Sequence, residues 1–370
     1  MTARFEPLVA TFATTLAILL AIAPAAALPR ALSHARASLQ DDGLDRLERD
    51  RIERGYYERI LTTERRLDHT AIDPHHSAHV PFDAGPLCLA VEDLREYVLK
   101  PNFKADLKGA AWSTNSRGLR DREYDPIKPA DTFRIAFVGD SIGAGWGVAD
   151  GEGFEPRLER ALGERSLSRG GPKIEILNFA VPGHSPAQRW EHFRRAGAEF
   201  HADAVLYEAT LADPGWDGRR LRGLLARGIG WDSPMFHDVL RNLNARPGQD
   251  VETYKSLLRS QRKTLLEGVY KEIVAESIKR GMPVYWVLVP RVGRPADPTE
   301  RAWLIDLARS AGFDAAIDLS DAYDGLEPST LAIKPDDFHP NVSGHARLAE
   351  RLAPALAPFL DSSIERKAAR

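Results

Sequence analysis

Residues 134–148 read RIAFVGDSIGAGWGV, an apolar run that passes into a serine set among glycines. A short apolar run that ends at small residues is typical of a buried strand followed by a tight turn. Ser141 could then be a nucleophile, part of a phosphate-binding loop, or a polar residue in an ordinary turn.

Four more apolar segments follow along the chain, and amphipathic segments separate them. We expect strands at 134–139, 174–180, 203–210, 283–290 and 313–320. We expect helices near 152–163, 186–198, 252–280, 298–311 and 343–359. Apolar strands that alternate with helices predict an α/β fold, in which a five-stranded parallel sheet is covered by helices on both faces.

The composition excludes several classes of protein. The chain has 370 residues, 43% of them hydrophobic, which is enough material for a substantial core. Its net charge of -3, with acids and bases mixed throughout, offers no basic stripe, so we expect no nucleic-acid partner. Cys88 is the one cysteine, so no disulfide forms within the chain.

The amino terminus resembles an export signal. Residues 8–29, LVATFATTLAILLAIAPAAALP, are uncharged and end in small residues, as a cleavable signal peptide does. The run is also about long enough to be an uncleaved membrane anchor. We expect residues 1–29 to be a signal peptide or a membrane anchor. The protein is then expected to be periplasmic or extracellular, and to contact the membrane only through this segment.

Residues 30–131 are expected to form a helical and loop extension ahead of the main domain. Residues 37–67 carry apolar side chains at helical spacing in a charged background. The next stretch is rich in proline and contains His75 and His79, four residues apart; we interpret it as a solvated loop rather than a metal site. The main domain is expected at 132–362, with an insertion at about 214–250.

The glycines around Ser141 favour a nucleophile turn. No lysine lies between Gly139 and Gly171, which excludes a Walker phosphate loop, and the glycine spacing does not complete a dinucleotide-binding fingerprint. Residues 139–143, GDSIG, do satisfy G-x-S-x-G, in which small neighbours expose a serine on a sharp strand-to-helix turn.

A nucleophilic serine needs a base, and the end of the chain offers one. Residues 334–345 read KPDDFHPNVSGH and lie between the fifth expected strand and the last helix. Loops at the carboxyl ends of parallel strands share one edge of the sheet, so His339 is expected near Ser141. Asp336, three residues before His339, could fold back and accept the proton on the second imidazole nitrogen.

These residues resemble the SGNH (GDSL) hydrolases, which are esterases and lipases with a flavodoxin-like three-layer fold. The resemblance covers residues 132–360 and implies Ser141 as nucleophile and Asp336 with His339 as its partners. The segment NFAVPGHS (178–185) looks like the second family block, which makes the backbone N–H groups of Ser141 and Gly183 the expected oxyanion donors. No cofactor or metal is needed for such chemistry.

The third family block departs from the family pattern. Where G-x-N-D is expected the sequence has Thr210-Leu211-Ala212-Asp213, so alanine replaces the asparagine donor. Loss of one oxyanion donor typically costs about 3 kcal/mol of transition-state stabilisation. Thr210 is a candidate replacement donor. We expect substrate contacts from Asp213, Trp216 and Arg291, although an arginine at the end of a strand is as readily a structural ion-pair partner.

The sequence therefore predicts a serine esterase that forms an acyl-enzyme on Ser141. Export, together with Trp146, Trp216 and Trp231 near loop ends, points to O-acyl groups of an extracytoplasmic glycan, although tryptophans also fill cores. The same residues are compatible with a small-molecule or lipid ester, or with an O-acyltransferase. A different class of function also stays open: a catalytically weakened domain that binds a glycan or a partner.

Overall fold

The described part of the protein is built around one parallel sheet. The computed structural model describes residues 87–369 except 231, 246–248 and 336. The sheet strands are β5 (Thr132–Val138), β6 (Lys173–Asn178), β7 (Ala204–Ala209), β8 (Val284–Leu288) and β9 (Ala315–Asp318). They are all parallel, in the order β6-β5-β7-β8-β9. This is the flavodoxin-like order, and it confirms the expected fold class.

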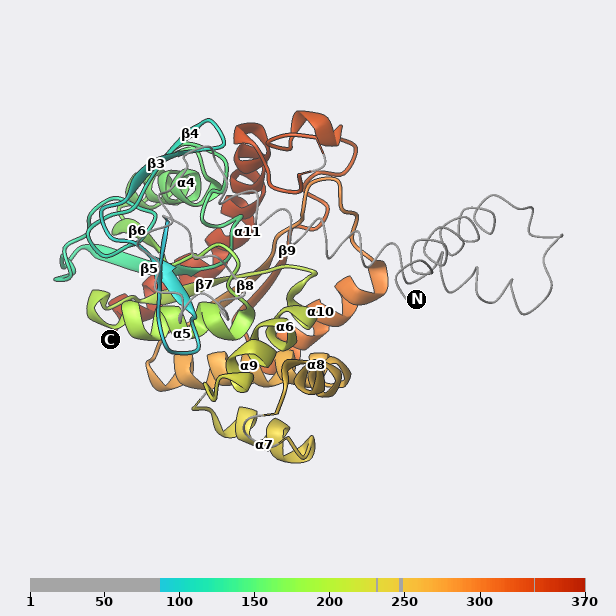
Figure 1. Ribbon diagram of the computed structural model, residues 1–370. Helices are drawn as coiled ribbons and strands as arrows, with labels where there is room; N and C mark the ends of the chain where they lie inside the picture. The colour runs from blue at the N-terminus through green and yellow to red at the C-terminus, as the bar shows by residue number, and fades with distance from the viewer. Residues whose placement is uncertain (1–86, 231, 246–248, 336, 370) are drawn as a thin grey trace, which may run out of the picture. The chain divides into compact units, whose positions relative to one another are not determined.

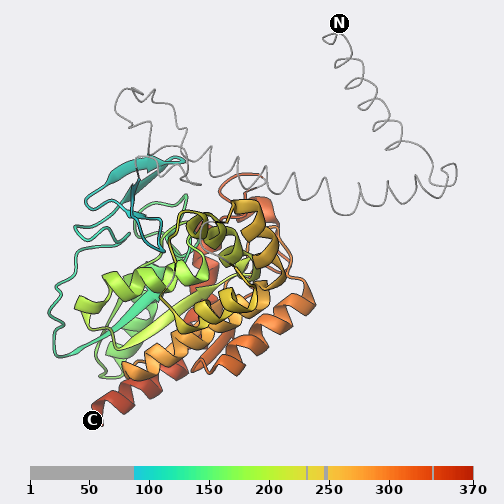
Figure 2. The same cartoon turned by 60° about the horizontal axis from the view of Figure 1, so that its bottom comes forward.

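Helices cover both faces of the sheet (Figures 1 and 2). One layer contains α5 (Pro186–Ala196), α6 (Asp213–Ala226), α9 (Arg262–Lys279) and α10 (Pro298–Ala311), with α7 (Pro234–Asn242) and α8 (Val251–Ser260) packed outside it. The other layer consists of α4 (Phe154–Ser168) and α11 (Val342–Ala368). A separate hydrophobic cluster lies between the sheet and each layer.

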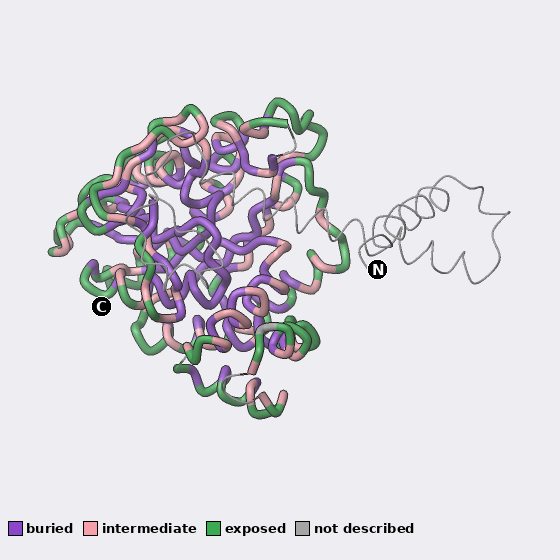
Figure 3. The backbone as a smooth tube through the Cα atoms, in the orientation of Figure 1, coloured by how far each residue is buried: buried purple, intermediate pink, exposed green. Residues whose placement is uncertain are grey.

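The burial of the strands explains their apolar sequences. Every residue of β5, TFRIAFV, is buried, as is every residue of β7 and β8. Figure 3 shows this buried centre in purple beneath more exposed helices and loops. Because both faces are covered, these strands are mostly apolar and show no regular alternation with polar residues.

The segments outside the sheet differ from the simplest expectation. The expected helix at 252–280 is two helices, α8 and α9, with Gln261 at the junction. The described part of the N-terminal extension contains two antiparallel hairpins, β1 (Cys88–Ala90) with β2 (Tyr97–Leu99) and β3 (Lys104–Leu107) with β4 (Ala110–Ser113). Neither hairpin was expected.

The expected signal or anchor, the expected helix at 37–67 and the histidine pair lie outside the described residues. Within the part of the chain that the structure describes, no helix is both long enough and apolar enough to cross a membrane. The division of the chain at residues 29 and 131 stays a prediction.

Candidate active site

Ser141 lies in the loop that follows β5, which we call the nucleophile loop (residues 139–146). On β7, the buried carboxylate of Glu208 accepts the N–H groups of Asp140 and Gly143 through one oxygen, at 2.8 and 3.1 Å. A Cβ atom on Gly139 or Gly143 would lie 2.2 or 2.4 Å from that oxygen. The G-x-S-x-G spacing therefore has a local cause, because both glycines make room for Glu208.

His339 meets Ser141 at this edge of the sheet. The loop after β9 leads into α11, whose first turn is capped by the side chain of Asn341. His339, just before that cap, places Nε2 2.8 Å from Ser141 Oγ and is 0% exposed. The expected meeting of these two side chains, 198 residues apart in the sequence, is therefore present in the structure.

The acid beside His339 is Asp337. Its Oδ1 lies 2.7 Å from His339 Nδ1 and accepts the backbone N–H of His339 at 3.0 Å. A carboxylate only accepts, so Nδ1 carries the proton and Nε2 is left to accept from the serine hydroxyl. The sequence prediction named Asp336, which lies outside the described residues. The structure assigns the Nδ1 contact to the adjacent aspartate, in a D-x-H spacing.

The charge states of the pair suit a general base. Burial lowers the pKa of His339 below its ordinary value, Lys108 lowers it further, and Asp337 acts in the opposite direction. Burial alone would raise the pKa of Asp337, but His339 and Lys108 together hold it well below its ordinary value. Near neutral pH the pair is therefore a carboxylate beside a neutral imidazole, as proton abstraction requires.

The two expected oxyanion donors come together, but each has a partner inside the protein. The N–H groups of Ser141 and Gly183 both donate to Oδ1 of Asp140, at 2.6 Å each. Asp140 therefore fills the position in front of both donors. The Thr210 hydroxyl, the candidate third donor, donates to Asp213 at 2.9 Å.

The three residues expected to bind substrate also have internal contacts. Asp213 is buried and pairs with Arg189 at 3.1 Å. Trp216 is 7% exposed and donates from Nε1 to the carbonyl oxygen of Gly183. Arg291 stacks over the ring of Phe338, beside His339. Each supports a loop of the site, and direct contact with a substrate stays a prediction for all three.

Sequence reasoning did not identify Lys108 or Arg189 as site residues. Lys108 Nζ lies 2.9 Å from Asp337 Oδ2 although 229 residues separate them. Arg189 on α5 is fully buried between Asp140 and Asp213. A buried arginine needs carboxylate partners, but no sequence spacing relates it to aspartates in two other loops. Neither residue carried a signal that could have been recognised in the sequence.

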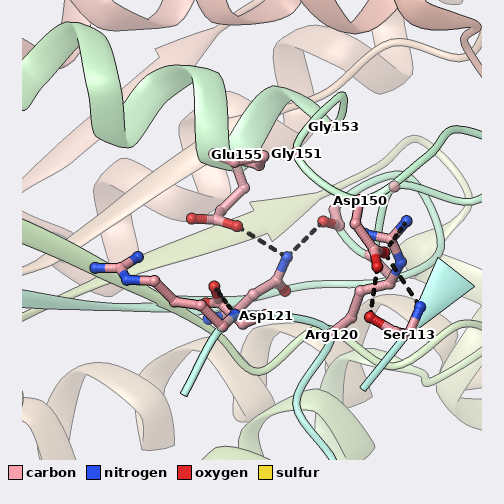
Figure 4. A pocket seen from close by; sticks show the side chains of 13 residues that line it. Ser113, Arg120, Asp121, Asp150, Gly151, Gly153 and Glu155 are labelled. Atoms are coloured by element: carbon pink, nitrogen blue, oxygen red, sulfur yellow. Dashed lines mark hydrogen bonds and ion pairs between the residues drawn. The ribbon is translucent and has the colours of Figure 1, made fainter. Parts of the chain in front are cut away.

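A pocket of about 320 Å³ lies behind the nucleophile loop (Figure 4). Gly143, Ala144 and Gly145 of this loop line the pocket, and so do the acids Asp121 and Glu155. Burial raises the pKa of both acids, that of Asp121 to about 7. Among the described residues that line this pocket there is no member of the Ser141–His339–Asp337 set, so it is separate from the candidate catalytic residues.

A comparison with models of known protein families shows to which family the chain is related. Residues 137–347, more than half of the chain, match the model of the GDSL-like Lipase/Acylhydrolase family. The chain belongs to this family. The resemblance to SGNH hydrolases is thereby confirmed, and this acylhydrolase is an esterase of the SGNH type.

Solved structures similar to this acylhydrolase include TesA, Axe2 and CEX. TesA is 17% identical, covers 61% of this chain and 98% of its own, and has a TM-score of 0.38. A catalytic mutant of Axe2, an acetylxylan esterase from Geobacillus stearothermophilus, is 17% identical. It covers 60% of this chain and 92% of its own, with a TM-score of 0.36. A two-domain esterase, CEX, active on acetylated mannans, is 16% identical. It covers 63% of this chain and 50% of its own, with a TM-score of 0.37.

No curated protein matches this acylhydrolase. Because the TM-scores are this low, the family assignment rests on the match of residues 137–347 and not on these three structures.

Proposed function

We propose that Ser141 is the nucleophile of this esterase and forms an acyl-enzyme with a carboxylic ester. The observation that carries the proposal is the 2.8 Å contact between Ser141 Oγ and His339 Nε2, with Asp337 on the opposite nitrogen. A serine hydroxyl is a weak nucleophile until a neighbouring base removes its proton, and that base is held in one tautomer by an acid.

The reaction proceeds in two acyl transfers. His339 removes the Ser141 proton while Oγ attacks the ester carbonyl, and it then returns the proton to the departing alcohol. Water attacks the acyl-enzyme in the same way and releases the acid. The N–H groups of Ser141 and Gly183 are the nearest donors to the developing oxyanion. Asp140 Oδ1 must leave them first, because two negatively charged oxygens do not share one pair of donors.

The burial of the site favours a small acyl group. Ser141 is 3% exposed and His339 is 0% exposed, which leaves little room for a long chain beside Oγ. On this proposal the natural substrate is an O-acetyl or similarly small ester of an extracytoplasmic glycan. The glycan part of the proposal rests on the export-like segment at residues 8–29. The buried Trp146 and Trp216 belong to the core and provide no open stacking surface.

The test is covalent labelling with a fluorophosphonate probe combined with hydrolysis of p-nitrophenyl acetate. The wild-type protein is expected to be labelled and to release acetate, and Ser141→Ala is expected to do neither. Ser362→Ala, on the exposed side of α11, is the matched control and should behave as wild type. Equal labelling of wild type and Ser141→Ala would contradict the assignment of the nucleophile.

A second candidate is a catalytically weakened domain that binds a glycan or a partner. Two observations favour it: Ala212 replaces the expected side-chain donor, and Asp140 occupies both backbone donors. A panel of acetyl esters, including acetylated xylo-oligosaccharides, separates the candidates. Acetate release supports the esterase, acetyl transfer to an added sugar supports an acyltransferase, and saccharide binding without either supports the binding domain.

A further inference from the structure

The tip of the β3–β4 hairpin presents a lysine in an uncommon backbone conformation. Leu107 pairs with Ala110 across a two-residue turn, in which Lys108 and Gly109 have φ values of 57° and 84°. A turn with two positive φ values favours glycine, asparagine or aspartate at both central positions. The turn itself gives no local reason for a lysine at position 108.

The lysine side chain reaches the acid of the candidate triad. Lys108 Nζ lies 2.9 Å from Oδ2 of Asp337, while Oδ1 of the same carboxylate binds His339. The side chain of Lys108 is 19% exposed and that of Asp337 is 0% exposed. Salt screens a pair this deeply placed much less than a surface pair. The two oxygens of Asp337 therefore have separate partners on opposite sides.

The hairpin is held against the end of the nucleophile loop and the segment that follows it. Trp112 on β4 is 1% exposed and packs edge-on against Trp146, with ring centroids 6.4 Å apart. Asp150 accepts the N–H of Ser113 at 3.1 Å and donates its own N–H to Ala111 at 3.1 Å. These contacts place the hairpin tip independently of the Lys108 ion pair.

We infer that Lys108 is a positioning residue of the esterase site, acting on His339 through Asp337. The inference rests on the proposed roles of Ser141, Asp337 and His339. The ammonium group holds Oδ2, which fixes the rotation of the carboxylate and keeps Oδ1 on the imidazole. It also offsets part of the carboxylate charge, so the imidazolium is stabilised less than it would be by Asp337 alone.

The direction of the electrostatic effect follows from the groups around the imidazole. His339 is faced by Asp337, Lys108, Asp140, Ser141 and His345. Lys334 lies near Lys108 and acts on its charge, and Asp336, adjacent to Asp337 in the sequence, lies outside the described residues. When the Lys108 charge is removed, Asp337 stabilises the imidazolium more strongly. The pKa of His339 then rises, and activity is lost at a higher pH on acidification.

The experiment compares Lys108→Met, Lys108→Gln and Lys108→Arg across pH with p-nitrophenyl acetate. Both neutral variants are expected to lower the plateau of kcat/KM by about tenfold or more, since misplacement of a catalytic group by ~1 Å can cost ~100-fold. They are also expected to shift the acidic limb to higher pH. Lys108→Arg should keep most of the wild-type plateau of kcat/KM and most of the wild-type position of the acidic limb. Lys104→Met, exposed on the same hairpin, is the matched control and should change neither.

A second measurement does not depend on turnover. Titration of the ¹⁵N-labelled His339 imidazole by NMR should show a higher pKa in Lys108→Met than in wild type. The rise should be smaller when Lys108→Met is added to Asp337→Asn, because only the direct effect of the Lys108 charge on the imidazole then remains. An unchanged imidazole titration in a folded Lys108 variant overturns the inference. If the wild-type protein is neither labelled by the fluorophosphonate probe nor active on p-nitrophenyl acetate, the proposed function is wrong. The NMR titration then still tests whether Lys108 acts on the His339 imidazole.

Discussion

At the scale of single residues, two adjacent aspartates compete for one role. The family spacing D-x-x-H points to Asp336, whereas Asp337 binds both the imidazole and the backbone N–H of His339. An aspartate that folds back on the backbone two residues later makes a common local turn. The sequence places an acid near His339, but spacing alone does not distinguish two neighbouring carboxylates.

Replacement of each aspartate in turn tests this assignment. Asp337→Asn is expected to lower kcat by ~10³–10⁴-fold, because the amide no longer holds the required imidazole tautomer. Asp336→Asn is expected to keep kcat within a few-fold of wild type. Steady-state hydrolysis of p-nitrophenyl acetate measures both variants. The reverse order of the two losses would return the acid role to Asp336.

At the scale of elements, β7 supports the nucleophile loop through one buried acid. Glu208 is 0% exposed, and burial raises its pKa from 4.5 to about 7. Between these two pH values the folded protein retains a proton that the unfolded chain has released. The contribution of Glu208 to stability is therefore complete below about pH 4.5 and is lost as the pH rises through about 7.

Glu208→Gln should remove this part of the pH dependence. The amide oxygen can still accept the N–H groups of Asp140 and Gly143, but the side chain no longer titrates. Thermal unfolding midpoints from pH 4.5 to 8 are expected to fall less with rising pH in the variant than in wild type. Asp121 and Asp217 have raised pKa values in the same range, so the difference between the two proteins is the relevant quantity. Parallel pH profiles would show that Glu208 does not titrate there.

The elements also show which parts of the fold could be predicted. The five sheet strands were predicted because helices cover both faces of the sheet, which makes the strands rich in apolar residues. The β3–β4 hairpin was not, since its strands have four residues each and β3 reads KADL with exposed and half-buried positions. The junction at Gln261 was missed because glutamine is a good helix former and does not mark a break.

At the scale of the whole molecule, Arg189 joins the loops of three neighbouring strands. Its guanidinium pairs with Asp140 after β5 and with Asp213 after β7, at 3.2 and 3.1 Å. It also donates to the carbonyl oxygens of His184, after β6, and of Glu208. The general rule for parallel sheets predicted that these loops share one edge. The residue that connects them could not be predicted, because the contacts come from distant parts of the chain.

Removal of this arginine should destabilise the whole sheet edge. Arg189→Met leaves Asp140 and Asp213 buried without their cation, which typically costs about 3–5 kcal/mol. Arg189→Lys keeps the charge but cannot span four acceptors, so an intermediate loss is expected. Arg195→Met on the same helix is the control: its side chain is 51% exposed, and its partner Glu191 still pairs with Arg194, so a loss of about 0–1 kcal/mol is expected. Urea unfolding measures all three. Equal free energies of unfolding for Arg189→Met and Arg195→Met would mean that the two carboxylates find other partners, and that the loops meet without the arginine.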